Sequence, residues 1–138
     1  MSIAIAPALL DTDILSAVMR QQPAAMSRAR VYLAAHRHLT FSIITRYEIL
    51  RGLYTKRATA QLAAFDQLCR ASVIIPLTDA IVVWAAEIYA DLHQRGALIG
   101  DADILIAATA LEQKMAVVTN NEAHYQRIVG LSLENWLR

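Results

Sequence analysis

Short, uninterrupted runs of apolar residues alternate along this chain with longer segments in which apolar positions recur every three or four residues. The short runs are typical of strands buried on both faces, and the wider spacing is typical of helices that bury one side. Strands are predicted at residues 3–10, Thr40–Ile44, Val73–Ile75, 115–118 and, last, Leu131–Leu133. Helices are predicted at residues 13–21, 25–36, 46–54, 58–70, 79–94, 102–113 and 122–128.

This order of elements predicts an α/β fold, because strands that alternate with one or two helices form a parallel sheet flanked by those helices. Pro23 separates the first two helices, Thr78 supplies an N-cap for the fifth, and Gly96 stops it. No repeat, low-complexity tract or linker interrupts the pattern. Residues 1–138 are therefore predicted to form a single domain with a central parallel sheet of four to five strands.

The composition adds one feature to this picture. Hydrophobic residues make up 57% of the chain and charged residues 18%, which is more apolar than an average soluble domain. A sheet covered on both faces and an apolar surface buried against a partner both explain this excess. The net charge of +1 shows no bias of the whole chain toward nucleic acid.

The single cysteine, Cys69, excludes an internal disulfide and a cysteine-based zinc site, and it is expected to be a packed core thiol. No apolar stretch reaches the roughly 18 to 20 residues that a membrane span needs. The N-terminal apolar run has no Lys or Arg before it and ends at Asp11, so a signal peptide is not expected. A cytoplasmic location without membrane association is the resulting expectation.

Acidic and polar residues follow the predicted strands. Asp11 ends the first apolar run, Glu48 comes soon after the second, and the trio Thr119-Asn120-Asn121 ends the run at 115–118. In a parallel sheet, ligands bind at the edge formed by the carboxyl ends of the strands. Carboxylates gathered there repel one another, so they stay ionised only when a positive group, most simply a divalent cation, joins them.

The segment Asp11-Thr12-Asp13 would place several oxygen ligands at a strand-to-helix turn. Hard cations such as Mg²⁺ and Mn²⁺ prefer such oxygens. A structural alternative is helix capping, in which Thr12 or Asp13 accepts hydrogen bonds from the first helical amides. Asp11 stands too early in the sequence for this capping role, so the pattern favours a functional role for it.

Two further acidic segments have structural alternatives. Thr45 followed by Glu48 fits a capping box, in which the threonine caps the helix and the glutamate bonds back to it. Asp101 at an N-cap and Asp103 in the first turn would both complement a helix dipole. One acidic residue is enough to cap this helix, and the segment has two. The second acid favours a functional role for Asp103 and keeps Asp101 as a candidate.

Four segments together resemble the PIN domain family, and most closely the VapC-type toxins of bacterial toxin–antitoxin pairs. They span nearly the whole chain, and they are Leu9-Leu10-Asp11-Thr12-Asp13-Ile14-Leu15, Ser42-Ile43-Ile44-Thr45-Arg46-Tyr47-Glu48-Ile49-Leu50-Arg51-Gly52-Leu53, Ile99-Gly100-Asp101-Ala102-Asp103-Ile104-Leu105-Ile106-Ala107-Ala108, and Val118-Thr119-Asn120-Asn121 running on to Leu133-Glu134-Asn135-Trp136. The resemblance implies a PIN-like sandwich and a Mg²⁺- or Mn²⁺-dependent endoribonuclease that hydrolyses RNA phosphodiester bonds.

By motif match, the resemblance implies that Asp11, Glu48 and Asp103 are the catalytic, metal-binding acids. Asp101 is a further candidate metal ligand. The supporting polar positions are Thr12, Asp13, Thr119 and Asn121. Many relatives carry Asp where this chain has Asn121, a departure that removes one charge and bears on a second metal ion, and many show Asn at the position of Asp13.

The resemblance also implies partners. Family relatives form homodimers and are held inactive by a small cognate antitoxin. The tail of such an antitoxin is expected to lie across the acidic pocket and to offer it a basic side chain. The high apolar fraction suits buried interfaces of this kind.

Two other interpretations remain open at this stage. Asp11-Thr12-Asp13 is similar to the opening motif of haloacid-dehalogenase-like phosphatases, but that family needs a lysine between its acidic motifs, and none occurs between Lys56 and Lys114. The second alternative is a catalytically weak PIN-like module that binds RNA or protein without cutting. Asn121 supports it, whereas the retained acids argue against it, because clustered carboxylates cost stability without a counter-ion.

Overall fold

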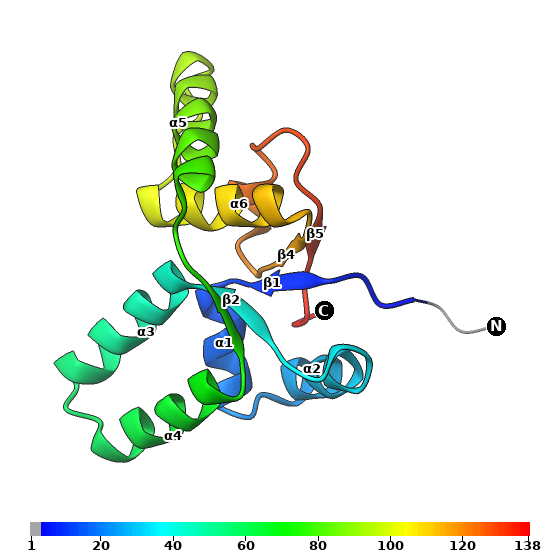
Figure 1. Cartoon of the computed structure of the whole chain (residues 1–138), viewed down its shortest axis with the longest axis vertical. Coiled ribbons are helices and arrows are strands. Elements are labelled where there is room, and N and C mark those ends of the chain that lie inside the picture. Colours follow the sequence, from blue (N-terminus) through cyan, green and yellow to red (C-terminus); the bar gives the residue numbers. More distant parts are fainter. Residues whose placement is uncertain (1–3) are drawn as a thin grey trace.

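The computed structural model describes residues 4–138, so Ile3 of the predicted strand 3–10 lies outside the described residues. Helices alternate with five short strands along the chain (Figure 1). The strands are β1 (Ala8–Leu10), β2 (Thr40–Ser42), β3 (Val73–Ile75), β4 (Ala116–Val118) and β5 (Leu133–Glu134). The helices are α1 (Thr12–Met19), α2 (Pro23–His36), α3 (Ile43–Thr55), α4 (Thr59–Arg70), α5 (Asp79–Gln94), α6 (Asp101–Gln113) and α7 (Glu122–Tyr125).

All strand pairs are parallel, as the alternation of strands and helices predicts. One ladder has the order β1-β4-β5, and β2 pairs with β3 in a second ladder. The two ladders lie side by side, since β1 packs next to β2 (Figure 1). The α/β sandwich is therefore confirmed, with its five strands divided between two ladders.

The β1 strand shows why a continuous apolar run predicts a strand here. Leu9 packs into a core cluster with side chains of α5 and α6, whereas Ala8 and Leu10 pack into a second cluster with side chains of α1 and α2. Successive side chains of a strand point to opposite faces, so both faces of β1 are covered by helices. The same holds in β4, where Val117 and Val118 belong to different clusters.

Several element ends differ from the prediction. Residues 4–7 form no strand and are exposed, so β1 covers only the last part of the predicted run 3–10. Ile43 and Ile44, predicted as strand, open α3, because the Ser42 side chain accepts a hydrogen bond from the amide of Ile44 (3.0 Å) and caps the helix. β5 begins at Leu133, where the predicted strand ended. The fifth helix, α5, has its predicted bounds and its predicted cap at Thr78.

No helix among residues 4–138 is both long enough and apolar enough to cross a membrane. Cys69 is buried, as predicted, and its Sγ lies 3.1 Å from Nη1 of Arg46. Burial raises the pKa of the Cys69 thiol, so it stays a protonated packing group.

Candidate functional site

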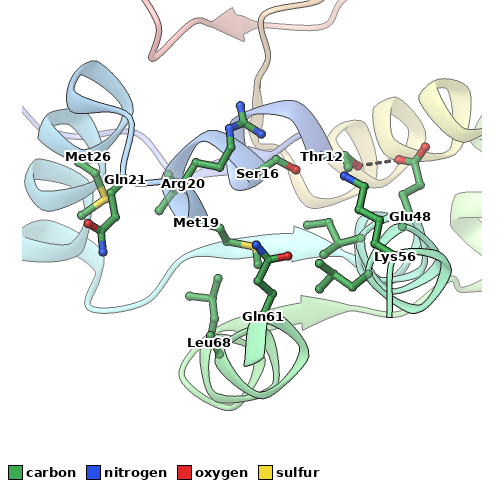
Figure 2. A pocket seen from close by; sticks show the side chains of 15 residues that line it. Thr12, Ser16, Met19, Arg20, Gln21, Met26, Glu48, Lys56, Gln61 and Leu68 are labelled. Atoms are coloured by element: carbon green, nitrogen blue, oxygen red, sulfur yellow. Dashed lines mark hydrogen bonds between the residues drawn. The ribbon is translucent and has the colours of Figure 1, made fainter. Parts of the chain in front are cut away.

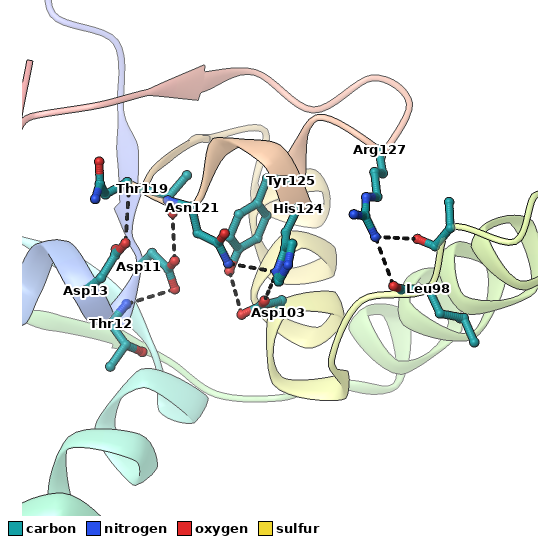
Figure 3. Close-up of polar contacts among 12 residues, drawn as sticks. Asp11, Thr12, Asp13, Leu98, Asp103, Thr119, Asn121, His124, Tyr125 and Arg127 are labelled. Atoms are coloured by element: carbon teal, nitrogen blue, oxygen red, sulfur yellow. Dashed lines mark hydrogen bonds and ion pairs between the residues drawn. The ribbon is translucent and has the colours of Figure 1, made fainter.

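Asp11 directly follows β1 and is held by two hydrogen bonds. Its Oδ1 accepts from the backbone amide of Thr12 (2.8 Å), and its Oδ2 accepts from the hydroxyl of Thr119 (2.8 Å), the residue that follows β4 (Figure 3). Because β1 and β4 are parallel neighbours, residues far apart in the sequence meet at this edge. Asp11 is also the N-cap of α1, so the prediction that it stands too early for capping is wrong.

Asp13 lies beside Asp11 on the first turn of α1. Its Oδ2 accepts a hydrogen bond from the amide of Asn120 (3.0 Å), and its Oδ1 is buried without a hydrogen-bond partner among the described residues. Burial, and then the charge of Asp13, raise the pKa of Asp11 to about 7. Burial also raises the pKa of Asp13. The two acids therefore form a pair that resists double ionisation without a positive partner.

Asp103 approaches the same place from the first turn of α6. Its charge contributes to the raised pKa values of Asp11 and Asp13, which places the three carboxylates near one another. Its Oδ1 accepts a hydrogen bond from the hydroxyl of Tyr125 (3.4 Å), and its Oδ2 lies 3.3 Å from Nδ1 of His124. Asp11, Asp13 and Asp103 are the acidic cluster of this site.

His124 and Tyr125 were not predicted as site residues. Their position in the sequence offered one signal: both follow Asn121 within the single helical turn of α7. Nδ2 of Asn121 lies 2.8 Å from the same Nδ1 of His124 that approaches Asp103. One ring nitrogen cannot accept from the amide and donate to the carboxylate at once, so the tautomer of the His124 ring decides which neighbour Nδ1 bonds.

Glu48 contacts Thr12, the residue that follows Asp11. The Thr12 hydroxyl donates to Glu48 Oε1 (2.6 Å) and lies 3.2 Å from the Thr45 hydroxyl, and Arg51 forms an ion pair with Glu48 Oε2 (3.6 Å). Because α3 begins at Ile43, Glu48 lies beyond its first turn. The predicted capping box of Thr45 and Glu48 is therefore wrong, which removes the structural alternative for Glu48.

A groove opens beside Glu48 between α1, α3 and α4 (Figure 2). Its volume is about 540 Å³. Thr12, Ser16 and Arg20 line one wall, and Glu48, Gly52 and Lys56 line the facing wall. Positions three to four residues apart share one face of a helix, so each wall is a stripe along one helix that starts at the Thr12–Glu48 hydrogen bond.

Asp101 does not join the acidic cluster. The N-cap of α6 is Gly100, so the prediction of Asp101 as N-cap is wrong, and Asp101 occupies the first helical position with an exposed side chain. Its carboxylate takes part in none of the side-chain hydrogen bonds or ion pairs found within residues 4–138. Asp103, two residues later, is the acid of this segment that faces the other carboxylates.

Part of this arrangement fits a divalent cation. Across residues 4–138, no three Asp, Glu, His or Cys side chains converge as a ready-made metal site. The donors nevertheless have the right chemistry, since carboxylate oxygens are the ligands that Mg²⁺ and Mn²⁺ prefer. The partnerless Oδ1 of Asp13 and the raised pKa of Asp11 both mark negative charge that lacks a counter-ion. The acidic cluster thus has the donors for a hard cation.

Comparisons with known proteins match this chain to ribonuclease-type domains. Residues 8–130 match the model of the PIN domain family. Ribonuclease VapC2 from Rickettsia felis is 29% identical over 129 residues, covering 93% of this chain and 96% of that protein. Ribonuclease VapC1 from Methanocaldococcus jannaschii is 33% identical over 93 residues, 67% of this chain and 66% of that protein.

A solved structure shows the same fold. It is the VapBC2 complex from Rickettsia felis bound to a DNA fragment from its promoter, and the matching chain has a TM-score of 0.84 at 28% identity. The match covers 94% of this chain and 98% of that one. The similarity of the fold therefore extends over nearly the whole of both chains.

Proposed function

Since this chain belongs to the PIN domain family, we propose that it is a divalent-metal-dependent endoribonuclease and the toxin of a VapBC-type toxin–antitoxin pair. One observation carries the catalytic part of the proposal. Asp11 and Asp13 at the start of α1 meet Asp103 at the start of α6, beside the carboxyl ends of β1 and β4, where one carboxylate oxygen is buried without a hydrogen-bond partner among residues 4–138. Such an arrangement costs stability unless a cation is bound there.

The acidic cluster would hold Mg²⁺ or Mn²⁺ through the carboxylates of Asp11, Asp13 and Asp103. When bound, such an ion polarises a phosphoryl oxygen and lowers the pKa of a water that attacks the phosphodiester bond. Thr119 fixes one oxygen of Asp11 and the amide of Thr12 fixes the other, so the orientation of this carboxylate is set before any ligand arrives. Preorganisation of this kind is what a catalytic site requires.

Glu48 has a different role in this proposal. The hydrogen bond from Thr12 and the ion pair with Arg51 hold its carboxylate at the wall of the groove. A carboxylate in this place can accept a proton from a water or orient that water beside the cluster. We therefore assign Glu48 to water positioning, next to the metal-binding carboxylates.

The groove supports an RNA substrate. Arg20 and Lys56 line it, and neither forms an ion pair with an acid within residues 4–138. Cations without an acidic partner beside a catalytic carboxylate suit the phosphates of a nucleic-acid strand. Arg46, two residues before Glu48, contacts Cys69 and Phe65 instead and does not line the groove.

The test of this proposal is an incubation of total cellular RNA with the antitoxin-free protein. Discrete fragments are expected with Mg²⁺ or Mn²⁺, and a chelator is expected to abolish them, because it removes the ion that lowers the pKa of the attacking water. Fragment ends are mapped by sequencing, which also identifies the RNA that is cut. Equal cleavage by metal-free and Mg²⁺-loaded protein would contradict the metal requirement.

Intact RNA in every reaction, with protein shown to be folded, would favour the alternative of a PIN-like module that binds without cutting. In that case, restoring an acid by Asn121→Asp is the next variant to assay. Cleavage of a simple aryl phosphate that Asp13→Ala abolishes would instead favour the phosphatase alternative.

The partner part of the proposal is a small antitoxin and a second copy of this chain. The acidic cluster lacks a counter-ion, so a basic side chain from an antitoxin tail would neutralise it and block it. An apolar stripe of Val82, Ala86 and Tyr89 is exposed on α5, a helix that projects from the body (Figure 1). A stripe of this kind suits a helix-to-helix contact between two copies.

Co-expression with a candidate cognate antitoxin tests these partners. The protein is expected to purify as a complex with a mass of at least two copies of each chain, measured by light scattering after gel filtration. Purification as a lone monomer would count against both partners.

A further inference from the structure

Tyr125 places a hydroxyl among the carboxylates from the core side. The residue is fully buried, and its ring packs in the core cluster that contains Ile106 and Ile128. Figure 3 shows its side chain directed toward Asp103, whose Oδ1 accepts a hydrogen bond from the hydroxyl (3.4 Å). Phenylalanine would fill the same core volume, and a buried hydroxyl costs free energy unless it is bonded. The Tyr125 hydroxyl is therefore explained by its hydrogen bond to Asp103 and not by the packing of the core.

The Tyr125 hydroxyl can only donate to these neighbours. Burial, followed by the charges of Asp11 and Asp103, raises the pKa of Tyr125 above its ordinary value, so the phenol stays protonated. The hydrogen bond that the hydroxyl donates is the one to Oδ1 of Asp103 (3.4 Å). Each carboxylate oxygen has two lone pairs, so one donated hydrogen bond leaves room for a cation on the same oxygen.

Asp103 is thus held by α7 on both of its oxygens. Tyr125 contacts Oδ1, and His124, the preceding residue, contacts Oδ2 at 3.3 Å. Asp103 is half-buried on α6, and its ring-bearing neighbours on α7 restrict the rotation of its carboxylate. Among the acids of the cluster, it is the one without a bond to a backbone amide within residues 4–138. Its orientation therefore depends on these two side chains.

We infer that Tyr125 is a positioning residue of the proposed metal site: its hydroxyl orients the Asp103 carboxylate toward Asp11 and thereby raises the affinity of the site for a divalent cation. The inference rests on the proposed function, because it assumes that the acidic cluster binds the cation. Partners of this kind, which hydrogen-bond to a metal ligand, typically change metal affinity about 10- to 100-fold when they are removed.

The test is the Mn²⁺ affinity of Tyr125→Phe in the full chain, measured by calorimetry without RNA. The affinity is expected to fall about 10- to 100-fold below that of the wild type. Tyr32→Phe is the matched control, since Tyr32 is also buried but its hydroxyl contacts only the backbone N (3.1 Å) and O (3.3 Å) of Ala8. This control is expected to unfold at a lower denaturant concentration with unchanged Mn²⁺ affinity.

A second comparison separates action through Asp103 from a general loss of order. His124→Ala removes the contact to the other oxygen of the same carboxylate and changes a half-exposed side chain, so folding is preserved. The double variant is expected to lose less affinity than the product of the two single losses, since both act through one group. If the loss of Mn²⁺ affinity in the double variant equals the product of the two single losses, the inference that both side chains act through Asp103 is wrong.

The outcomes distinguish this inference from the proposed function. Equal Mn²⁺ affinity in Tyr125→Phe and the wild type would overturn the inference and leave the ribonuclease proposal standing. A wild type that cleaves RNA but binds no Mn²⁺ or Mg²⁺ would overturn the metal requirement together with the inference.

Discussion

Asp11→Asn is expected to lower the rate of RNA cleavage by on the order of 1,000-fold, because a metal-assisted step gains several kcal/mol and each 1.4 kcal/mol is a tenfold change in rate. The substitution removes the charge of the most buried acid of the cluster. It keeps the helix cap, since asparagine and aspartate are equally good N-cap residues and Asp11 accepts the Thr12 amide through one oxygen. Initial rates of fragment formation from a defined RNA provide the measurement.

The matched control is Asp79→Asn, which makes the same chemical change at the start of α5, away from the cluster. It is expected to cleave at the wild-type rate. Cleavage by Asp11→Asn within a few-fold of the wild type would show that the cluster is not the catalytic centre.

The metal-free protein is expected to be more stable at pH 5 than at pH 8. The pKa of Asp11 is raised from 3.8 to about 7 in the folded state, so between these values the folded protein keeps a proton that the unfolded chain has lost. Stability therefore falls as the pH rises through this window and is lowest above pH 7. The raised pKa of Asp13 acts in the same direction. Each unit of pKa is worth about 1.4 kcal/mol, so the loss amounts to a few kcal/mol.

Urea unfolding at the two pH values, with chelator present, measures this effect. Asp11→Asn is expected to reduce the dependence of the unfolding free energy on pH and to be more stable than the wild type at pH 8. This variant keeps all the histidines, so a reduced dependence assigns the effect to Asp11. Mn²⁺ at pH 8 is expected to stabilise the wild type, since it binds only the folded state. If the metal-free wild type unfolds at a higher urea concentration at pH 8 than at pH 5, the prediction that ionised, buried Asp11 destabilises the fold is wrong.

The strands and most of the helices could be predicted from the sequence because the helices cover both faces of the β1–β4 ladder. Burial on both faces leaves a continuous apolar run, which is visible without knowledge of the partner strand. The same signal misleads at Ile43 and Ile44, because a buried strand end and a buried helix start are both apolar. The Ser42 hydroxyl decides between them by capping α3, and no apolar pattern reports a hydrogen bond.

The acids of the site could be predicted from their places after strands, but their partners could not. Asp11 and Thr119 meet because β1 pairs with β4. The register of that pairing depends on the tertiary structure and cannot be read from the sequence of either strand. Tyr125 has the same signature in the sequence as any core aromatic residue. Only the direction of its hydroxyl, toward Asp103, separates it from a packing residue.

The pairing of β1 with β4 also governs when during synthesis this site can exist. Asp11 and its partner Thr119 are 108 residues apart, and Leu10 finds its strand neighbour only at Val118. Chains emerge from the ribosome with the N-terminus first, and contacts between distant segments form last. Asp11 therefore lacks the hydrogen bond from the Thr119 hydroxyl until nearly the whole chain has emerged. The acidic cluster, with both oxygens of Asp11 fixed, can therefore form only late in the synthesis of the chain.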